Sequence, residues 1–196
     1  MRRRIATLLI GFCLAACSGI PLRSIPRLMS LQNTLLEMNP ADFMLAIQAD
    51  ARMTPPAGAA PVMHIAIRPR VESAFDAMEK TLPMHFTVST AEVNNAKGLA
   101  PAPAQRRWLI YSFTPESQAE LTRIQNYFKR LQAQQQGKGD GSVAVGIAQE
   151  GVAAKDPALA NTRWESWLQT SAREGFYELW SGTIADLLKQ AQRKAN

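Results

Sequence analysis

The sequence predicts an α+β fold, with one mostly antiparallel β-sheet of about six or seven strands and helices packed on one of its faces. Short segments of alternating apolar and polar residues follow one another closely, as strands do in hairpins. Longer segments with apolar residues three and four positions apart lie between them. Residues 107–113 (RWLIYSF) are apolar on both faces, which is typical of a central strand covered by helices. Together these patterns indicate one layer of strands and one layer of helices.

The first sixteen residues have the layout of a secretory signal peptide. Arg2, Arg3 and Arg4 form a positive segment, and residues 5–16 form an uncharged, mostly apolar stretch. A helix of twelve residues is about 18 Å long, whereas the hydrocarbon core of a bilayer is about 30 Å thick. This stretch is therefore too short to be a stable transmembrane helix, and we expect residues 1–16 to be cleaved.

The end of this stretch, Leu14-Ala15-Ala16-Cys17, resembles the lipobox of bacterial lipoproteins. The resemblance implies that lipid is attached to the Cys17 sulfur, that the chain is cut before Cys17, and that the new amino group is acylated. Two or three acyl chains make such an anchor long-lived, because each buried CH₂ contributes about 0.8 kcal/mol. Ser18 is similar to the residue found in lipoproteins sent to the outer membrane. The resemblance thus implies a protein held in the inner leaflet of the outer membrane and facing the periplasm.

Composition is consistent with a single domain. Residues 17–23 are expected to be the lipidated N-terminus and a short tether, and 24–196 a single globular periplasmic domain of ordinary size. Loss of the signal peptide removes three arginines and no acid, so the formal net charge falls from +6 to +3, which gives no indication of nucleic-acid binding. Cys17 is the only cysteine that remains and its sulfur is expected to carry lipid, so no internal disulfide is predicted. The sequence has no CxxC motif and no Cys/His cluster, so no zinc site is predicted, and no cofactor is expected.

The first half of the domain predicts two helices and three strands. A stripe of apolar residues at helical spacing predicts a helix between Ser24 and Asn39; it consists of Leu28, Leu31, Leu35 and Met38. Residues 42–52 and 62–70 are predicted strands, expected to pair as a hairpin through a Pro- and Ala-rich connection. A short helix is predicted at 72–80. Residues 83–89 alternate as a strand, with Met84, Phe86 and Val88 on one face and His85 and Thr87 on the other.

The second half begins with a loop at 94–105 and the central strand at 107–113. A helix follows, with Thr114 as its N-cap and Pro115 at its first position, and Gly137 ends it. Residues 142–149 predict a strand. Residues 163–170 and 175–181 predict a strand pair around a turn, and the capping-box pattern Thr183 to Asp186 predicts a closing helix.

The sequence contains no motif that commits it to a reaction. His64 and His85 lie on the polar sides of predicted strands without an identifiable third ligand, so both are expected to be solvated. Glu165 and Glu178 would form a carboxylate pair across the final hairpin, as glycosidases use, only if both point away from the sheet; exposed glutamates on strands are the favoured interpretation. The segment Gly139-Asp140-Gly141-Ser142 lacks the glycine that a nucleophile elbow places after its serine, so a loop is predicted.

Aromatic residues gather in the last third of the chain. Trp164 and Trp167 fall on opposite faces of one predicted strand, so one of them is a candidate for exposure beside Tyr177. Such a surface would suit a protein partner, a sugar or a membrane interface. The favoured alternative is that these side chains fill the space between the sheet and the helices.

Three functions are compatible with this sequence. The first is a non-enzymatic binding or assembly factor of the cell envelope, anchored through Cys17 and in contact with an envelope protein. The second is a lipoprotein that binds a lipid or glycan, which requires a pocket lined by residues such as Met44, Phe86 and Trp164. The third is an envelope hydrolase, which requires His64 or His85 to be buried beside a carboxylate or hydroxyl group. The sequence does not indicate an oligomeric state.

Overall fold

The computed structural model describes residue 31 and residues 34–69, 75–89, 96–135, 141–153 and 155–195. The predicted signal peptide, the lipobox at Cys17, the tether at 17–23 and most of the first predicted helix lie outside the described residues. From that helix, Leu31 and Leu35 are buried, and the Leu35 amide donates to the Leu31 carbonyl at 2.8 Å.

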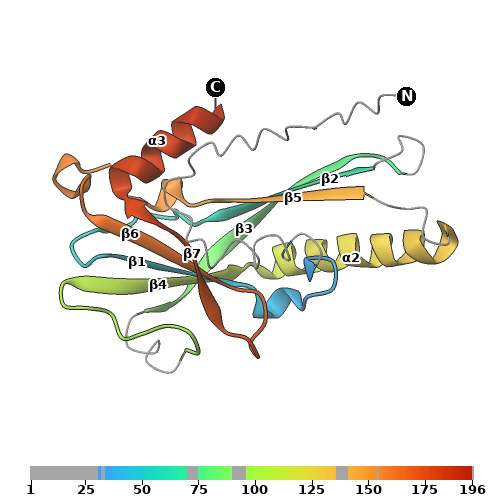
Figure 1. The fold of residues 1–196 in the computed structure, drawn as a ribbon, viewed down its shortest axis with the longest axis horizontal. Coiled ribbons are helices and arrows are strands. Elements are labelled where there is room, and N and C mark those ends of the chain that lie inside the picture. The colour runs from blue at the N-terminus through green and yellow to red at the C-terminus, as the bar shows by residue number, and fades with distance from the viewer. Residues whose placement is uncertain are drawn as a thin grey trace, which may run out of the picture.

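The described chain forms seven strands and two α-helices (Figure 1). The strands are β1 (Met44–Asp50), β2 (Val62–Pro69), β3 (Met78–Ser89), β4 (Arg106–Phe113), β5 (Gly141–Ala148), β6 (Arg163–Gln169) and β7 (Phe176–Thr183). The helices are α2 (Pro115–Gln135) and α3 (Ile184–Ala195), with short 3₁₀ turns η2 (Pro40–Asp42), η4 (Glu150–Val152) and η5 (Pro157–Leu159). The predicted α+β class is confirmed.

All strand pairings are antiparallel and build one sheet in the order β5-β2-β3-β4-β1-β6-β7. The long strand β3 joins its two halves, because residues 78–83 pair with β2 and residues 84–89 pair with β4. β4 is the central strand, as its two apolar faces predict. The register between β3 and β4 shifts between Phe86 and Val88, and a bulge of this kind increases local twist.

The sheet curls around one of its faces, here called the core face. At one end of the curl, Gln149 follows β5 and reaches β6. Its Oε1 accepts a hydrogen bond from Trp164 Nε1 at 3.0 Å, and its Nε2 donates to Ser166 Oγ at 3.3 Å. These bonds join the β5 end of the sheet to β6 and satisfy polar groups that are buried away from water.

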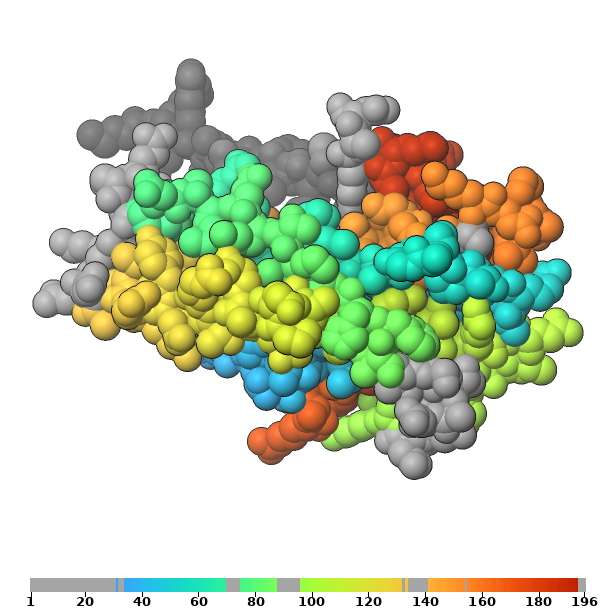
Figure 2. All heavy atoms as spheres, turned by 180° about the vertical axis from the view of Figure 1, so that it is seen from behind, coloured from blue at the N-terminus to red at the C-terminus, as the bar shows by residue number. Residues whose placement is uncertain are grey.

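Both helices cover the core face. The buried side of α2 carries Leu121, Ile124 and Phe128, and that of α3 carries Ile184 and Leu187; all five belong to one hydrophobic cluster with the core-face residues of the strands. Figure 2 shows α2 (yellow) along one side of the molecule, between β3 (green) and residues 34–42 (blue). The single-faced helix layer predicted from the sequence is therefore observed.

Both α-helices begin where their cap residues predict. The Ser117 amide donates to Thr114 Oγ1 at 3.2 Å at the start of α2. At the start of α3, the Asp186 amide donates to Thr183 Oγ1 and the Thr183 amide donates to Asp186 Oδ2, each at 3.1 Å. This reciprocal pair is a capping box.

Two predictions for the first half of the chain are wrong. The strands predicted at 42–52 and 62–70 form, but β1 and β2 do not pair, because β1 lies between β4 and β6 while β2 lies between β5 and β3. Within the region predicted as a short helix at 72–80, Met78 begins β3, since residues 78–83 are held by backbone bonding to β2. Tertiary pairing here overrides local helical spacing.

Candidate binding surface

The opposite side of the sheet, here called the outer face, has two halves that differ in what covers them. Over β4, β1 and β6 the loop at 96–105 packs against the sheet. Trp108 Nε1 donates to the Ala100 carbonyl at 3.0 Å, and Leu99 and Ala102 contact a small buried cluster formed by Ala46, Trp108, Ile110 and Phe176. Over β3, β2 and β5 no comparable layer lies among the described residues.

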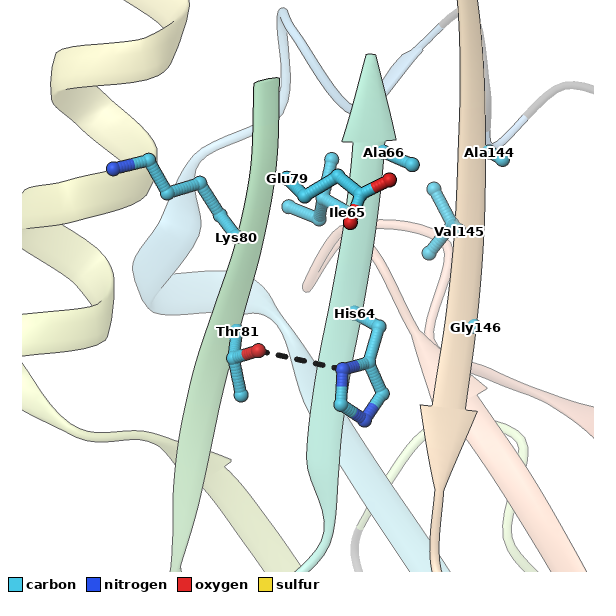
Figure 3. Close-up of a pocket in the computed structure, with 9 residues that line it drawn as sticks. All are labelled: His64, Ile65, Ala66, Glu79, Lys80, Thr81, Ala144, Val145 and Gly146. Atoms are coloured by element: carbon cyan, nitrogen blue, oxygen red, sulfur yellow. Dashed lines mark hydrogen bonds between the residues drawn. The ribbon is translucent and has the colours of Figure 1, made fainter. Parts of the chain in front are cut away.

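The uncovered half contains a shallow depression of about 380 Å³ (Figure 3). It is lined by residues of β2, β3 and β5: His64, Ile65, Ala66, Glu79, Lys80, Thr81, Ala144, Val145 and Gly146. The strand register explains the floor of the depression. In one cross-strand row, Ala66 lies between Ala144 on β5 and Glu79 on β3. In the next row, His64 lies between Gly146 on β5 and Thr81 on β3. Small residues at these positions leave the backbone accessible beside larger polar side chains.

Polar groups border the depression without forming a catalytic constellation. His64 Nδ1 and Thr81 Oγ1 are 3.4 Å apart, and both side chains are exposed. Arg68 Nη2 and Glu79 Oε1 are also 3.4 Å apart, in an exposed ion pair. Lys80 points to the other side of the sheet, where its Nζ lies 3.0 Å from Glu120 Oε1 on α2. The surface therefore offers hydrogen-bonding groups and a small apolar floor, which suits binding.

His85 lies four residues after Thr81 along β3, on the same outer face. Its Nε2 is 3.5 Å from Ser112 Oγ, whose shorter contact is with Thr87 Oγ1 at 2.7 Å. Thr87 sits at the bulge, which explains how its side chain reaches Ser112. Both histidines are exposed, as the sequence predicts, and the burial that the hydrolase hypothesis requires is not present.

The three aromatic residues proposed as a contact surface do not lie together. Trp164 is fully buried on the core face, and Tyr177 is buried there opposite Leu168. Trp167 is on the outer face, where it is half-buried and packs edge-on against Trp108 with ring centroids 4.8 Å apart. The opposite placement of the two tryptophans matches the alternation, but a shared surface is excluded because Trp164 and Tyr177 fill the interior.

The residues predicted to line a lipid or glycan pocket, Met44, Phe86 and Trp164, do not come together. Met44 lies opposite Gln169 on the outer face, whereas Trp164 lies in the core on the other side of the same sheet. Phe86 is 50% exposed and packs against the Tyr111 ring at a centroid distance of 5.7 Å. These three residues therefore cannot line one cavity.

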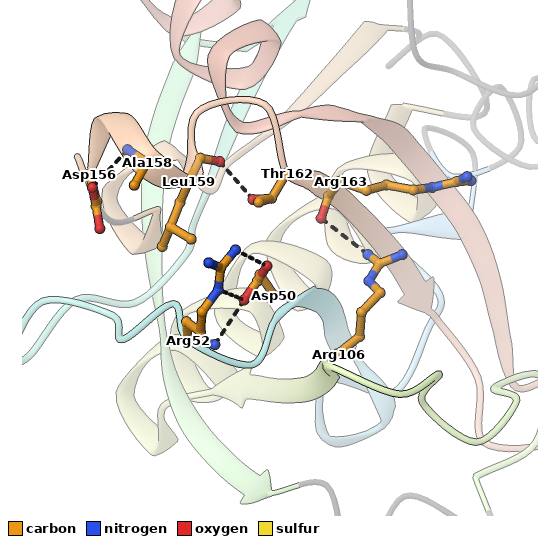
Figure 4. Close-up of polar contacts among 8 residues, drawn as sticks. All are labelled: Asp50, Arg52, Arg106, Asp156, Ala158, Leu159, Thr162 and Arg163. Atoms are coloured by element: carbon orange, nitrogen blue, oxygen red, sulfur yellow. Dashed lines mark hydrogen bonds and ion pairs between the residues drawn. The ribbon is translucent and has the colours of Figure 1, made fainter.

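Glu165 is part of an ionic cluster rather than a carboxylate pair. It lies opposite Ser181, whereas Glu178 lies opposite Trp167, so the two glutamates are not direct cross-strand partners. Glu165 Oε2 accepts from Arg106 Nη1 at 2.6 Å, and Oε1 pairs with Arg163. Arg106 Nη2 also donates to the Gln48 carbonyl. The same nitrogen donates to the Arg163 carbonyl (Figure 4). The Glu165 side chain is only 9% exposed, so this cluster serves to satisfy a buried charge.

A second ion pair lies nearby at the end of β1. Arg52 Nε and Nη2 donate to the two carboxylate oxygens of Asp50 at 2.9 and 2.8 Å, which is a bidentate arrangement (Figure 4). These hydrogen bonds lower the pKa of Asp50 to about 2. The two charges are matched within the chain, and the pair closes the turn after β1.

In the part of the chain that the structure describes, no group of three or more His, Cys, Asp or Glu side chains is placed to hold a metal ion. Within the same residues, none of the helices has the length and apolarity needed to cross a membrane. Comparisons with protein families, curated proteins and solved structures found no match to the chain.

Proposed function

We propose that this chain is a non-enzymatic binding or assembly factor of the bacterial cell envelope, anchored to the inner leaflet of the outer membrane by lipid on Cys17. We further propose that the outer face of β3, β2 and β5 contacts an envelope protein. The signal-peptide layout and the lipobox-like run Leu14-Ala15-Ala16-Cys17 support the anchor.

We choose the outer face of β3, β2 and β5 on the basis of one observation. The outer face of the sheet is covered by the 96–105 loop over β4, β1 and β6, but its other half presents a floor of Ala66, Ala144 and Gly146 between polar side chains. Protein surfaces that bind partners combine accessible apolar area with a polar rim. A shallow, open depression of this kind favours a protein contact over an enclosed small-molecule site.

Binding of a lipid or glycan is the second candidate. The core face cannot serve it, because the helices and Trp164 fill that side. The ligand would have to occupy the open depression beside His64, where aliphatic acyl chains find little apolar surface. Extraction of the purified protein with organic solvent, followed by mass spectrometry, distinguishes this function by the presence of a stoichiometric lipid or sugar.

The anchor is tested by mass spectrometry of the mature N-terminal peptide and by membrane fractionation. We expect a diacylglyceryl and acyl mass on Cys17, and release of a Cys17→Ala variant from the membrane fraction. A wild-type peptide that begins at Cys17 without lipid, or a variant that remains in the membrane, contradicts this part of the proposal.

The binding role is tested by cross-linking in intact cells with a tagged full chain, followed by identification of the cross-linked proteins. Cys17→Ala serves as the control, because it alters the anchor and leaves the described surface unchanged. We expect a defined envelope protein to be enriched with the wild type and diminished with the variant. If no protein is enriched, the assembly-factor role is wrong.

A further inference from the structure

The edge strand β5 lacks the features that usually protect a sheet edge. Its eight residues, Gly141–Ala148, contain no charged residue and no proline, and they pair with β2 in an unbroken register. Among the described residues, no segment other than β2 bonds to the β5 backbone. A long, regular and uncharged edge is a template for pairing with another strand.

The opposite edge, β7, is built differently. The Phe176 amide donates to the Lys97 carbonyl at 2.8 Å, so the 96–105 loop covers the start of the strand. The β6–β7 pairing contains a register shift between Ser166 and Trp167, and Glu178 places a charge within β7. Because bulges, charges and covering loops all discourage edge pairing, the contrast singles out β5 as the edge open to association.

We propose that β5 pairs antiparallel with β5 of a second copy of this chain, around a two-fold axis perpendicular to the sheet. Such an axis keeps the core face of both copies on the same side, so residues of the same face pair with each other. Centred on Val145, the pairing sets Val143 against Ile147 of the partner copy and Val145 against itself. Ala144 then lies against Gly146 of the partner copy on the outer face.

The side chains of β5 fit this pairing on both faces. Val143, Val145 and Ile147 are half-buried at the margin of the core cluster, and pairing continues their row into the second copy. Cross-strand pairs of β-branched residues stabilise a sheet. On the outer face, a Cβ added to Gly146 would meet nothing within 4 Å, so the space above this position can hold a larger side chain.

One pair of opposite charges, Glu150 and Arg68, lies near the two ends of β5. Glu150 lies two residues after the last residue of β5, while Arg68 lies on β2 opposite Ser142, near the first residue of β5. In an antiparallel pair, the end of β5 in one copy lies beside the start of β5 in the other. Glu150 of each copy therefore comes near Arg68 of the other copy. Arg68 and Glu79 are 3.4 Å apart with both side chains largely exposed, and an ion pair of that kind holds Arg68 only weakly.

The test measures the oligomeric state of the purified full chain in detergent by sedimentation equilibrium. It compares the wild type with Ala144→Lys/Gly146→Lys and with Ala144→Glu/Gly146→Glu. Both positions are accessible on the outer face, so the monomer tolerates the changes, but pairing sets like charges against each other. We expect a wild-type dimer, and dimerisation weakened at least about tenfold in each variant.

Mixing the lysine and glutamate variants is expected to restore dimers, because opposite charges then face each other across the two-fold axis. The matched control, Ala119→Lys/Ala185→Lys, adds the same charge at exposed positions on α2 and α3 and should remain dimeric. A monomeric wild type, or lysine and glutamate variants that dimerise separately as well as when mixed, overturns the proposal. This outcome is independent of whether an envelope partner is found, because only the purified chain is present.

Discussion

At the scale of single residues, Glu165 shows how the outer face holds a charge that is nearly removed from water. Two arginines share its carboxylate, and the side chain of one of them, Arg106, is 16% exposed and also donates from Nη2 to two backbone carbonyls. A buried carboxylate in this setting depends on its partners more than it adds to stability. Its role is therefore to join β4 to β6 across β1.

Replacing Glu165 with Ala is expected to lower the free energy of unfolding by about 3 kcal/mol, because Arg106 would stay buried without a counter-charge. Urea unfolding at neutral pH measures this change. Glu174→Ala, at an exposed turn position, is the matched control and should change stability by less than about 0.5 kcal/mol. Equal effects of the two substitutions would show that the cluster does not hold the strands together.

The capping box of α3 predicts a contribution to folding stability that depends on pH. Hydrogen bonds from the Thr183 hydroxyl and amide lower the pKa of Asp186 below its usual value. Because the folded-state pKa is lower than the unfolded one, this stabilisation is present above the usual pKa of 3.8 and is lost as pH falls through the folded value. Thr183→Ala should therefore cost about 1 kcal/mol at neutral pH and less at pH values below the folded pKa. A cost that stays constant with pH would contradict the reciprocal cap.

At the scale of elements, two glycines fasten the 96–105 loop to the β6–β7 turn. Gly98 and Gly175 both have positive φ, and a Cβ on either would overlap the backbone of the facing segment. A Cβ at Gly175 would lie 2.4 Å from the Lys97 carbonyl oxygen. The loop that covers one half of the outer face is thus held by backbone contact that other residues would prevent.

Gly58 allows the steric part of this contact to be measured separately. It has φ of +74° against +79° at Gly175, but a Cβ there would meet nothing within 4 Å. We expect Gly58→Ala to cost about 1–2 kcal/mol from backbone strain alone, and Gly175→Ala to cost at least about 2 kcal/mol more. Thermal unfolding of both variants provides the comparison. Similar losses in the two would mean that the loop moves away from β7 without penalty.

Most elements were predictable because their signals are local. Alternation located the strands at 44–50, 62–69 and 141–148, and cap residues located the starts of α2 and α3. The partner of each strand was not predictable in the same way. β1 pairs with β4 and β6, which follow it by more than fifty residues, and no local pattern distinguishes this insertion from a hairpin with β2.

The candidate site was only partly predictable for a related reason. Alternation predicted that His64 lies on the polar face of its strand and that Trp164 and Trp167 lie on opposite faces, and both predictions are confirmed. A bulge, however, adds a residue to one strand and so changes which residues of the two strands lie opposite each other. The shift between Ser166 and Trp167 puts Tyr177 opposite Leu168 in the core rather than beside Trp167. The depression itself arises from Ala66, Ala144 and Gly146, which become neighbours only through the β2–β5 register. Their small size was visible in the sequence, and their proximity was not.

At the scale of the whole molecule, curling separates the packed side of the sheet from the accessible side. The helices and the Gln149 bridge complete the core face, and the 96–105 loop completes half of the outer face. The remaining half, over β3, β2 and β5, is the surface to which we assign binding. The lipid that we propose on Cys17 would hold this surface at the membrane and raise its effective concentration toward the proposed envelope partner.

The measurement that tests this assignment most directly is site-specific photo-cross-linking in cells, with a photoreactive amino acid at one position of the full chain. Thr81 borders the depression, and Thr122 on α2 is another exposed threonine, which lies outside it. We predict that one defined envelope protein is captured from position 81 and not from position 122. Capture from position 122 alone, or the same products from both positions, would contradict the assignment of the outer face of β3, β2 and β5 as the binding surface.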